Sequence, residues 1–72
     1  ISDAGHPILR AAAYLLGGYI GAGYIDHDAA ESMINSMIDS HWYLSKKPQI
    51  YKQTAKTMIN KGILQPTYFN SI

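Results

Sequence analysis

Cysteine is missing from the 72-residue sequence, so neither a disulfide framework nor a thiolate zinc site is available to it. No apolar run comes near the ~20 residues that span a bilayer, and the first residues lack the basic and apolar regions of a secretory signal. No segment alternates apolar with polar residues for long enough to predict a strand. We therefore expect one small helical domain over residues 1–72, located in the reducing cytoplasm and without a membrane partner.

Acidic side chains are missing from the second half of the sequence. Residues 41–72 carry five lysines and no acid, a charge of +5, whereas residues 1–40 carry one arginine against five acids, a charge of −4. This asymmetry favours a surface that faces a polyanion, although ordinary solvated surfaces explain it as well. The sequence begins with Ile1 and a short polar stretch, so we expect a domain taken from a longer protein.

Glycine is concentrated in one place, since "LLGGYIGAG", residues 15–23, holds four of the six glycines. A phosphate-binding loop needs a strand before its glycines and a helix after them, and here a helical pattern comes first. The spacing predicts a helix over 7–22, with Pro7 in its first position and Gly23 ending it. The expected apolar face of this helix consists of Ile8, Ala12, Leu15, Leu16, Tyr19 and Ile20.

Ala13, Gly17 and Gly21 are spaced four residues apart, so they share one side of that helix. A glycine inside a helix costs about 1 kcal/mol relative to alanine. Close packing of another backbone against this small-residue stripe would offset the cost. We predict that the stripe packs against the second or third helix; contact with a partner protein is the alternative.

The second predicted helix begins after Asp26, a good N-cap, with Asp28 and Glu31 in its first turns. Its apolar side follows helical spacing through Ala30, Met33, Ile34, Met37, Ile38 and His41.

The third predicted helix begins after Ser45 as its N-cap, tolerates Pro48 in its first turn and ends at Gly62. Its inner face should consist of Ile50, Tyr51, Thr54, Ala55, Met58 and Ile59. The tail should place Ile63, Leu64, Tyr68 and Phe69 over an open end of the core. Short connections between these helices predict an all-α fold, a compact three-helix bundle with a short C-terminal tail packed on the core.

The sequence contains no pattern typical of a catalytic or metal site. His6, His27 and His41 include no pair at i and i+4, the spacing with which one helix binds a metal ion. The acids of the second helix occupy ordinary helix-start positions, and no serine has a visible base beside it. We therefore predict no catalytic residue, no metal and no cofactor, and we expect His41 to cap the end of the second helix as a cation.

Lysines give the one indication of a binding surface, and we predict DNA contact through all five: Lys46, Lys47, Lys52, Lys56 and Lys61. Lys52 and Lys56 are one helical turn apart, and we place them on the side opposite the apolar face.

Two aromatic residues stand beside the first lysines. Lys46 and Lys47 lie at a helix start, whose free amides favour phosphate. Trp42 and Tyr43 either stack on an unpaired base or belong to the core.

The run "GHPILRAAAYLLGGYIGAGYIDHDAAESMI" resembles a helical segment near the C-terminal part of primase and primase-helicase proteins of phages, plasmids and mobile elements. The run "SKKPQIYKQTAKTMINKG" is similar to the basic element that follows there. The resemblance implies an accessory domain of a bacterial DNA primase, a nucleotidyltransferase whose catalytic carboxylates and zinc-binding modules lie elsewhere. No catalytic residue carries over, and the positions that match in type are Lys52, Thr54, Lys56 and Lys61.

Two functions follow as expectations. In the first, the domain contacts single-stranded or primed template DNA and supports primer synthesis in replication. In the second, it is a protein-interaction module that docks a replicative helicase or another domain of the same protein, through the small-residue stripe or a tyrosine-rich surface. A purely structural linker domain is a third possibility. Salt dependence separates the first two, because phosphate contacts release counterions and apolar docking does not.

Overall fold

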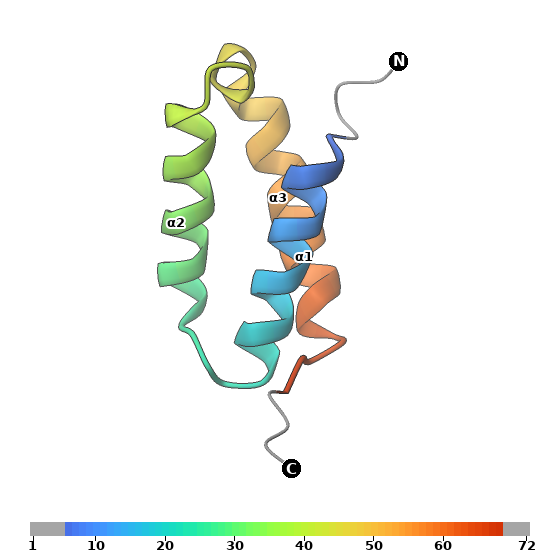
Figure 1. Cartoon of the computed structure of the whole chain (residues 1–72). Coiled ribbons are helices and arrows are strands. Elements are labelled where there is room, and N and C mark those ends of the chain that lie inside the picture. The colour runs from blue at the N-terminus through green and yellow to red at the C-terminus, as the bar shows by residue number, and fades with distance from the viewer. Residues whose placement is uncertain (1–5, 69–72) are drawn as a thin grey trace.

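Three α-helices and one short 3-10 turn make up the regular structure of the computed structural model, which describes residues 6–68 (Figure 1). The elements are α1 (Pro7–Gly21), α2 (His27–Ser40), η2 (Leu44–Lys46) and α3 (Pro48–Ile63). α1 and α3 run in the same direction, and α2 runs against both. The predicted all-α three-helix bundle is confirmed, and no residue from 6 to 68 lies in a strand.

The connection between α1 and α2 follows its local sequence signals. Gly23 has a φ of 85°, the left-handed conformation that ends a helix, and the amide of Tyr24 donates to the carbonyl of Tyr19 at 2.9 Å. The side chain of Asp26 accepts a hydrogen bond from the amide of Asp28 at 3.1 Å, as an N-cap does. The predicted ends of both helices are therefore confirmed to within a residue.

The start of α3 differs from the prediction that Ser45 is its N-cap. Ser45 lies inside η2, Lys47 is the N-cap, and Pro48 holds the first helical position. Proline has no amide hydrogen to leave unpaired there, so it suits the first position. Leu44 is buried, and the 3-10 turn carries its side chain into the core. No side chain among residues 6–68 caps the first turn of α3.

Apolar side chains from every element form the buried core: Leu9, Ala13, Ala30, Ile34, Ile38, Leu44, Tyr51, Ala55 and Ile59. The predicted face of α1 is confirmed in part, since Ala12, Leu16 and Ile20 are half-buried and pack against the core. Ile8 is 73% exposed and Leu15 is exposed as well, whereas Leu9 and Ala13 are buried. The helix takes this orientation because Gly17 packs against the backbone of α3.

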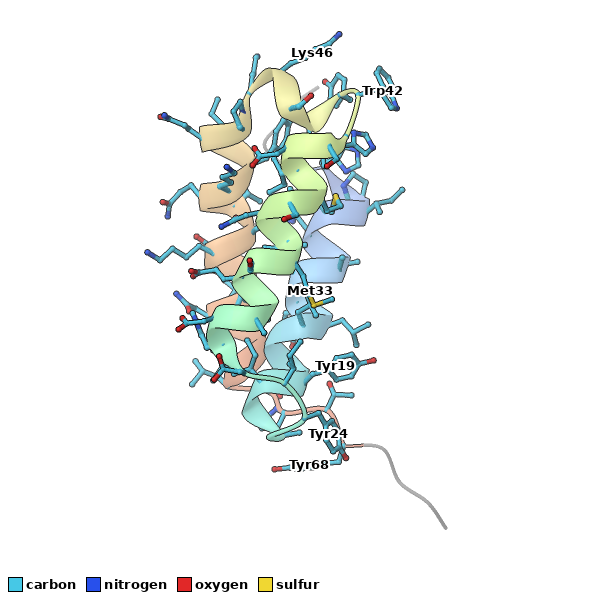
Figure 2. The ribbon with its side chains drawn as sticks, turned by 90° about the vertical axis from the view of Figure 1, so that its left-hand side faces the viewer. Tyr19, Tyr24, Met33, Trp42, Lys46 and Tyr68 are labelled. Carbon is cyan, nitrogen blue, oxygen red and sulfur yellow. The ribbon has the colours of Figure 1, made fainter. Side chains whose placement is uncertain are left out.

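Two side chains of the other predicted faces also point outwards. Met33 is 55% exposed, and Ile50 is exposed to a similar degree. Figure 2 shows Met33 at the edge of α2 that borders α1. Both residues lie at the margin of an apolar face, where the neighbouring helix no longer covers them. The remaining pattern holds, since Ile34 and Ile38 are buried.

Glycines bring α1 and α3 into backbone contact. A Cβ atom added to Gly17 would clash with the carbonyl oxygen of Ile59 and would lie 2.9 Å from the Cα atom of Gly62. Gly21 approaches the carbonyl of Ile63 in the same way. The prediction that the small-residue stripe packs on another helix of the chain is therefore confirmed, and α3 is that helix.

Gly62 does not end the third helix, contrary to the prediction. It is buried inside α3, which continues through Ile63. A Cβ atom at this position would clash with the carbonyl oxygen of Tyr14 and would lie 2.9 Å from the Cα atom of Gly17. Glycine serves here for close approach of two backbones, and its conformational freedom plays no part.

The C-terminal tail packs on the bundle, as predicted. Ile63 contacts the core as expected, and the residues beyond it contact α1 in a different way. The amide of Thr67 donates to the carbonyl of Gly18 at 3.0 Å, and the side chain of Thr67 covers that glycine. Leu64 and Tyr68 are exposed, so they do not cover the core, and Phe69 lies outside the described residues. A backbone hydrogen bond holds the tail in place of the expected apolar cover.

Candidate nucleic-acid interface

The five lysines do not form a single stripe. Lys52 and Lys61 are nine residues apart, which places them on opposite sides of a helix that turns by about 100° per residue. Lys46 belongs to η2, and Lys47 precedes α3. The structure thus divides the lysines among a groove between α2 and α3, the flank of α3 near α1, and the α2–α3 corner, by which we mean residues 41–47.

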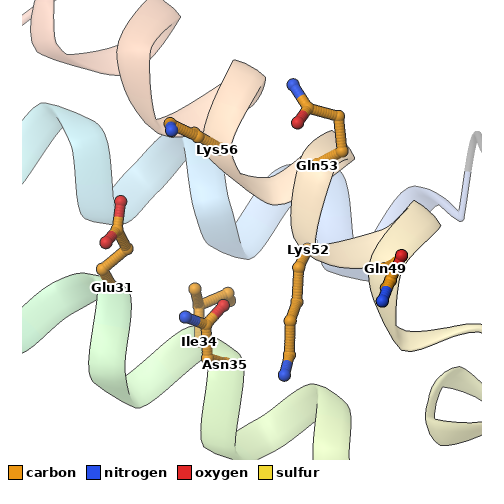
Figure 3. A pocket seen from close by; sticks show the side chains of 7 residues that line it. All are labelled: Glu31, Ile34, Asn35, Gln49, Lys52, Gln53 and Lys56. Atoms are coloured by element: carbon orange, nitrogen blue, oxygen red, sulfur yellow. The ribbon is translucent and has the colours of Figure 1, made fainter.

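Seven residues line the groove between α2 and α3: Glu31, Ile34, Asn35, Gln49, Lys52, Gln53 and Lys56 (Figure 3). The prediction that Lys52 lies opposite the apolar face is wrong. Its side chain extends toward α2, where Nζ lies 3.0 Å from a carboxylate oxygen of Asp39. Glu31 projects into the same groove from α2. The acids of α2 therefore offset part of the positive charge of α3.

The groove suits neither a strong ion pair nor a small-molecule ligand. The side chains of Lys52 and Asp39 are 36% and 57% exposed, so their pairing contributes about 0–1 kcal/mol. The groove volume of about 410 Å³ is in the range of ligand sites. Its lining, however, is amide and charged groups around one apolar residue, Ile34, whereas ligand sites are mostly apolar.

Lys61 lies on the other flank of α3, where it lines a hollow together with Arg10 of α1. The rest of the lining is uncharged: Gln53, Thr54, Thr57 and Met58. Neither cation forms an ion pair with another residue of the described part of the chain. This hollow is therefore a second, smaller positive surface.

The α2–α3 corner carries the single tryptophan of the sequence. Trp42 is 74% exposed, so it is a surface residue and not part of the core. The Nζ atom of Lys46 lies 5.9 Å from the centre of its ring, within the range of a cation–π contact. Both side chains project from the end of the bundle (Figure 2). Tyr43, by contrast, is half-buried and packs against the core.

His41 organises this corner in a way that the sequence analysis missed. Its Nδ1 atom accepts hydrogen bonds from the amides of Tyr43 at 3.0 Å and Leu44 at 3.2 Å. Its ring also stacks on Trp42, with centroids 5.8 Å apart and planes 23° apart. His41 does terminate α2, but its ring binds the amides that follow and not the helix carbonyls. A side-chain acceptor two and three residues before these amides is an N-cap signal, more familiar from asparagine or aspartate.

The corner lies at the electropositive end of the bundle. α1 and α3 both begin at this end, so two partially positive helix starts lie near each other, while α2 contributes one C-terminus (Figure 1). Lys46 and Lys47 add two cations. The nearest described acid along the chain, Asp39, is paired with Lys52. This balance favours an anionic ligand.

Other chemistry has little support in the described residues. Between residues 6 and 68, no group of three or more histidine, cysteine, aspartate or glutamate side chains is placed to hold a metal ion. None of the described helices combines the length and apolar character needed to cross a bilayer.

No protein-family model, no curated protein and no solved structure matches the sequence. The resemblance to primase proteins therefore stays a hypothesis that rests on the quoted residues. The function has to be inferred from the surface of the molecule.

Proposed function

We propose that this chain is an accessory DNA-binding domain that contacts single-stranded or primed template through the α2–α3 corner. The observation that carries the proposal is the exposed Trp42 with the ammonium group of Lys46 beside its ring. An exposed aromatic ring can stack on an unpaired base, and adjacent lysines can neutralise the flanking phosphates. Lys47 and the uncapped start of α3 lie in the same corner and add to its attraction for phosphate.

The other lysines contribute unequally to the proposed contact. Lys56 in the groove and Lys61 on the other flank of α3 are separate from the corner and contribute less than Lys46 and Lys47. Lys52 contributes little because Asp39 already neutralises it. We expect exposed lysines to make about two to four contacts with phosphates, and we expect no base-specific contact. Binding should therefore be weak and independent of sequence.

The wider role rests on the resemblance alone. In a primase, the domain would hold template DNA while other parts of the protein synthesise the primer in the cytoplasm. No catalytic role is assigned to any residue of this chain.

The proposal is tested by titrating a fluorescently labelled oligothymidine with the 72-residue chain at several salt concentrations. For single strands, log K falls with log salt by about 0.7 per phosphate contact, so two to four contacts give a slope of about −1.4 to −2.8. Trp42→Ala should weaken binding about tenfold, because stacking contributes roughly 1–3 kcal/mol per base. Lys46→Ala combined with Lys47→Ala should flatten the slope by about 1.4.

Lys52→Ala is the charge control: it removes one positive charge, where the double variant removes two, from a lysine that is already paired. Its affinity and salt slope should stay close to those of the wild type. Absence of binding at the lowest salt concentration, or full affinity in Trp42→Ala, would contradict the proposed contact.

A protein-interaction module is the second candidate, and the outer side of α1 and α2 favours it. Ile8, Leu15 and Met33 are exposed there, and α1 carries one charged side chain, Arg10, over its length. Leu15 and Met33 each lie seven residues from the α1–α2 connection (Ala22 and Asp26), so antiparallel packing places them at the same height. Exposed apolar side chains that gather on one side are typical of docking surfaces.

This apolar side replaces the small-residue stripe as the docking surface, because α3 already occupies the stripe. Tyr19, Tyr24 and Tyr68 lie at the lower end of the same edge (Figure 2). A replicative helicase or another domain of the same protein would cover this side in an interaction that salt barely affects. Leu15→Ser combined with Met33→Ser should weaken such docking and leave oligothymidine binding intact.

A further inference from the structure

His41 makes the two side-chain hydrogen bonds that shape the α2–α3 corner, and both go to one nitrogen. Nδ1 accepts from the amides of Tyr43 and Leu44 at 3.0 and 3.2 Å, and the amide of Ser45 donates to the main-chain carbonyl of His41 at 3.1 Å. One residue thus holds the turn that leads to Lys46. An imidazole nitrogen accepts hydrogen bonds only while it carries no proton.

Two aromatic rings lie against the His41 ring, those of Trp42 and His6. From the start of α1, the His6 ring lies edge-on at 6.1 Å between centroids, and its own Nδ1 accepts from the amide of Leu9 at 3.4 Å. The His6 ring also lies 6.2 Å from Tyr43 and 6.4 Å from Tyr51. The Tyr51 hydroxyl is buried and has no hydrogen-bond partner among the described residues. None of these neighbours carries a formal negative charge.

Three charged side chains lie near the His41 ring along the chain: Asp39, Lys46 and Lys47. Asp39, two residues before His41, has its carboxylate 3.0 Å from Lys52 Nζ. Lys46 lies over the Trp42 ring, and Lys47 precedes α3. The carbonyl end of α2 favours a cation, but that attraction does not restore the two hydrogen bonds that a proton on Nδ1 removes.

Protonation of Nδ1 would set an N–H group against two amide N–H groups. The opened turn has no such conflict, because its amides are free to bond to water. A proton on Nδ1 therefore removes the two hydrogen bonds that hold the turn closed. Acid therefore favours opening of the turn between His41 and Lys46.

We infer that His41 is a proton-dependent clasp: the neutral imidazole holds the corner that carries Trp42 and Lys46, and a proton releases it. The inference deepens the proposed function, and its DNA-binding part rests on that proposal. A released corner binds DNA more weakly, because it has to be ordered again on the strand. Charge alone has the opposite effect, since an added positive charge strengthens contact with phosphate. The direction of the pH effect therefore separates the clasp from simple electrostatics.

Trp42 is the only tryptophan in the sequence, so fluorescence excited at wavelengths that tyrosine does not absorb reports on the corner. Its emission should change between about pH 8 and about pH 5, the range in which imidazole gains a proton. The amide NMR shifts of Tyr43 and Leu44 should move with the same midpoint. Their hydrogen-exchange protection, corrected for the intrinsic rate at each pH, should fall roughly tenfold on the acid side.

Two substitutions isolate the role of His41. His41→Asn keeps a side-chain acceptor near the same amides but does not titrate, so its emission should stay constant over the same range. His27→Asn removes a histidine at the opposite end of the bundle and should keep the wild-type profile. A flat wild-type profile overturns the clasp even if the His41→Asn chain fails to fold, and so does an unchanged profile in a folded His41→Asn chain.

The regulatory part is tested with labelled oligothymidine at about pH 8 and about pH 5.5. Wild-type affinity should fall about fivefold in acid, and the affinity of His41→Asn should stay constant. Tighter wild-type binding in acid would overturn regulation by the clasp. Failure to bind at both pH values refutes the proposed DNA contact, and with it this regulation, whereas the emission and exchange results decide the clasp separately.

Discussion

α1 and α3 meet through glycine, whereas α2 joins the bundle through branched side chains. Gly17 and Gly62 face each other across the first interface, with no room for a Cβ atom on either. Ile34 and Ile38 fill the space between α2 and the rest of the bundle. The same small domain therefore contains one interface that is sensitive to added atoms and one that is sensitive to lost atoms.

The two interfaces also differ in the source of their stability. Where the glycines meet, close approach of α1 and α3 gains dispersion contacts between the two backbones. α2 gains mainly from transfer of apolar side chains out of water, about 0.8 kcal/mol for each buried CH₂ group. The polar groove beside Lys52 lies between α2 and α3 and is lined by side chains of both helices. The backbones of α2 and α3 therefore do not touch there as those of α1 and α3 do.

The largest expected effect is truncation on α2. Ile38 has no exposed surface, so Ile38→Ala leaves a cavity and should destabilise the fold by about 2–5 kcal/mol. Urea denaturation followed by far-ultraviolet circular dichroism measures the change. Met33→Ala, on the same helix but exposed, is the control and should cost about 0.5 kcal/mol or less. Equal costs for the two variants would show that the observed face of α2 is wrong.

An intermediate effect is expected from adding one methyl group between α1 and α3. Glycine to alanine inside a helix normally stabilises by about 0.5–1 kcal/mol. Gly17→Ala should instead destabilise by about 1–3 kcal/mol, because the new Cβ meets the backbone of Ile59 and Gly62. Thermal denaturation measures the sign.

The control for Gly17→Ala is the reverse exchange at an exposed helical site. Ala29 is exposed on α2, and Ala29→Gly should cost about 1 kcal/mol through propensity alone. A higher melting temperature for Gly17→Ala would contradict the prediction. It would show that α1 and α3 can move apart enough to accommodate a Cβ atom at little cost.

The smallest effect is expected at the margin of α2 and α3. Lys52→Ala should cost about 0–1 kcal/mol, because both partners of its ion pair are substantially exposed. A double-mutant cycle with Asp39→Ala isolates the pairing energy, and high salt should reduce it. A coupling energy well above about 1 kcal/mol would mean that the Lys52–Asp39 pair helps to hold α2 on the bundle. Branched apolar side chains would then not be the main source of stability at that interface.

Much of the fold could be predicted from signals that act within one or two turns of chain. Asp26 starts α2, Gly23 ends the helix before it, and the spacing of Gly17 and Gly21 indicates close packing. Faces were predicted less well, because an apolar residue at the margin of a helix is covered only if a neighbour reaches it. Ile8 is the clearest case, since it fits the helical pattern and is exposed.

The candidate site was predictable in composition but not in arrangement. The lysines and Trp42 are visible in the sequence, and helical spacing alone places Lys52 and Lys61 on opposite sides of α3. Which of these sides faces α2 and which faces α1 follows from how α3 packs against its neighbours. The role of His41 was missed, because histidine accepting two amide hydrogen bonds has no strong sequence signature.

By itself, the sequence determined the all-α class, the beginnings of the first two helices, the turn at Gly23 and the need to pack the glycines. Each of these depends on backbone hydrogen bonds and conformational preferences of residues close together in the chain. Only the tertiary structure decided which side of α1 is buried, that Gly62 serves a helix contact, and that Lys52 meets Asp39. Those outcomes require atoms from two different helices, and the distance between helices is set by the packing of the whole core.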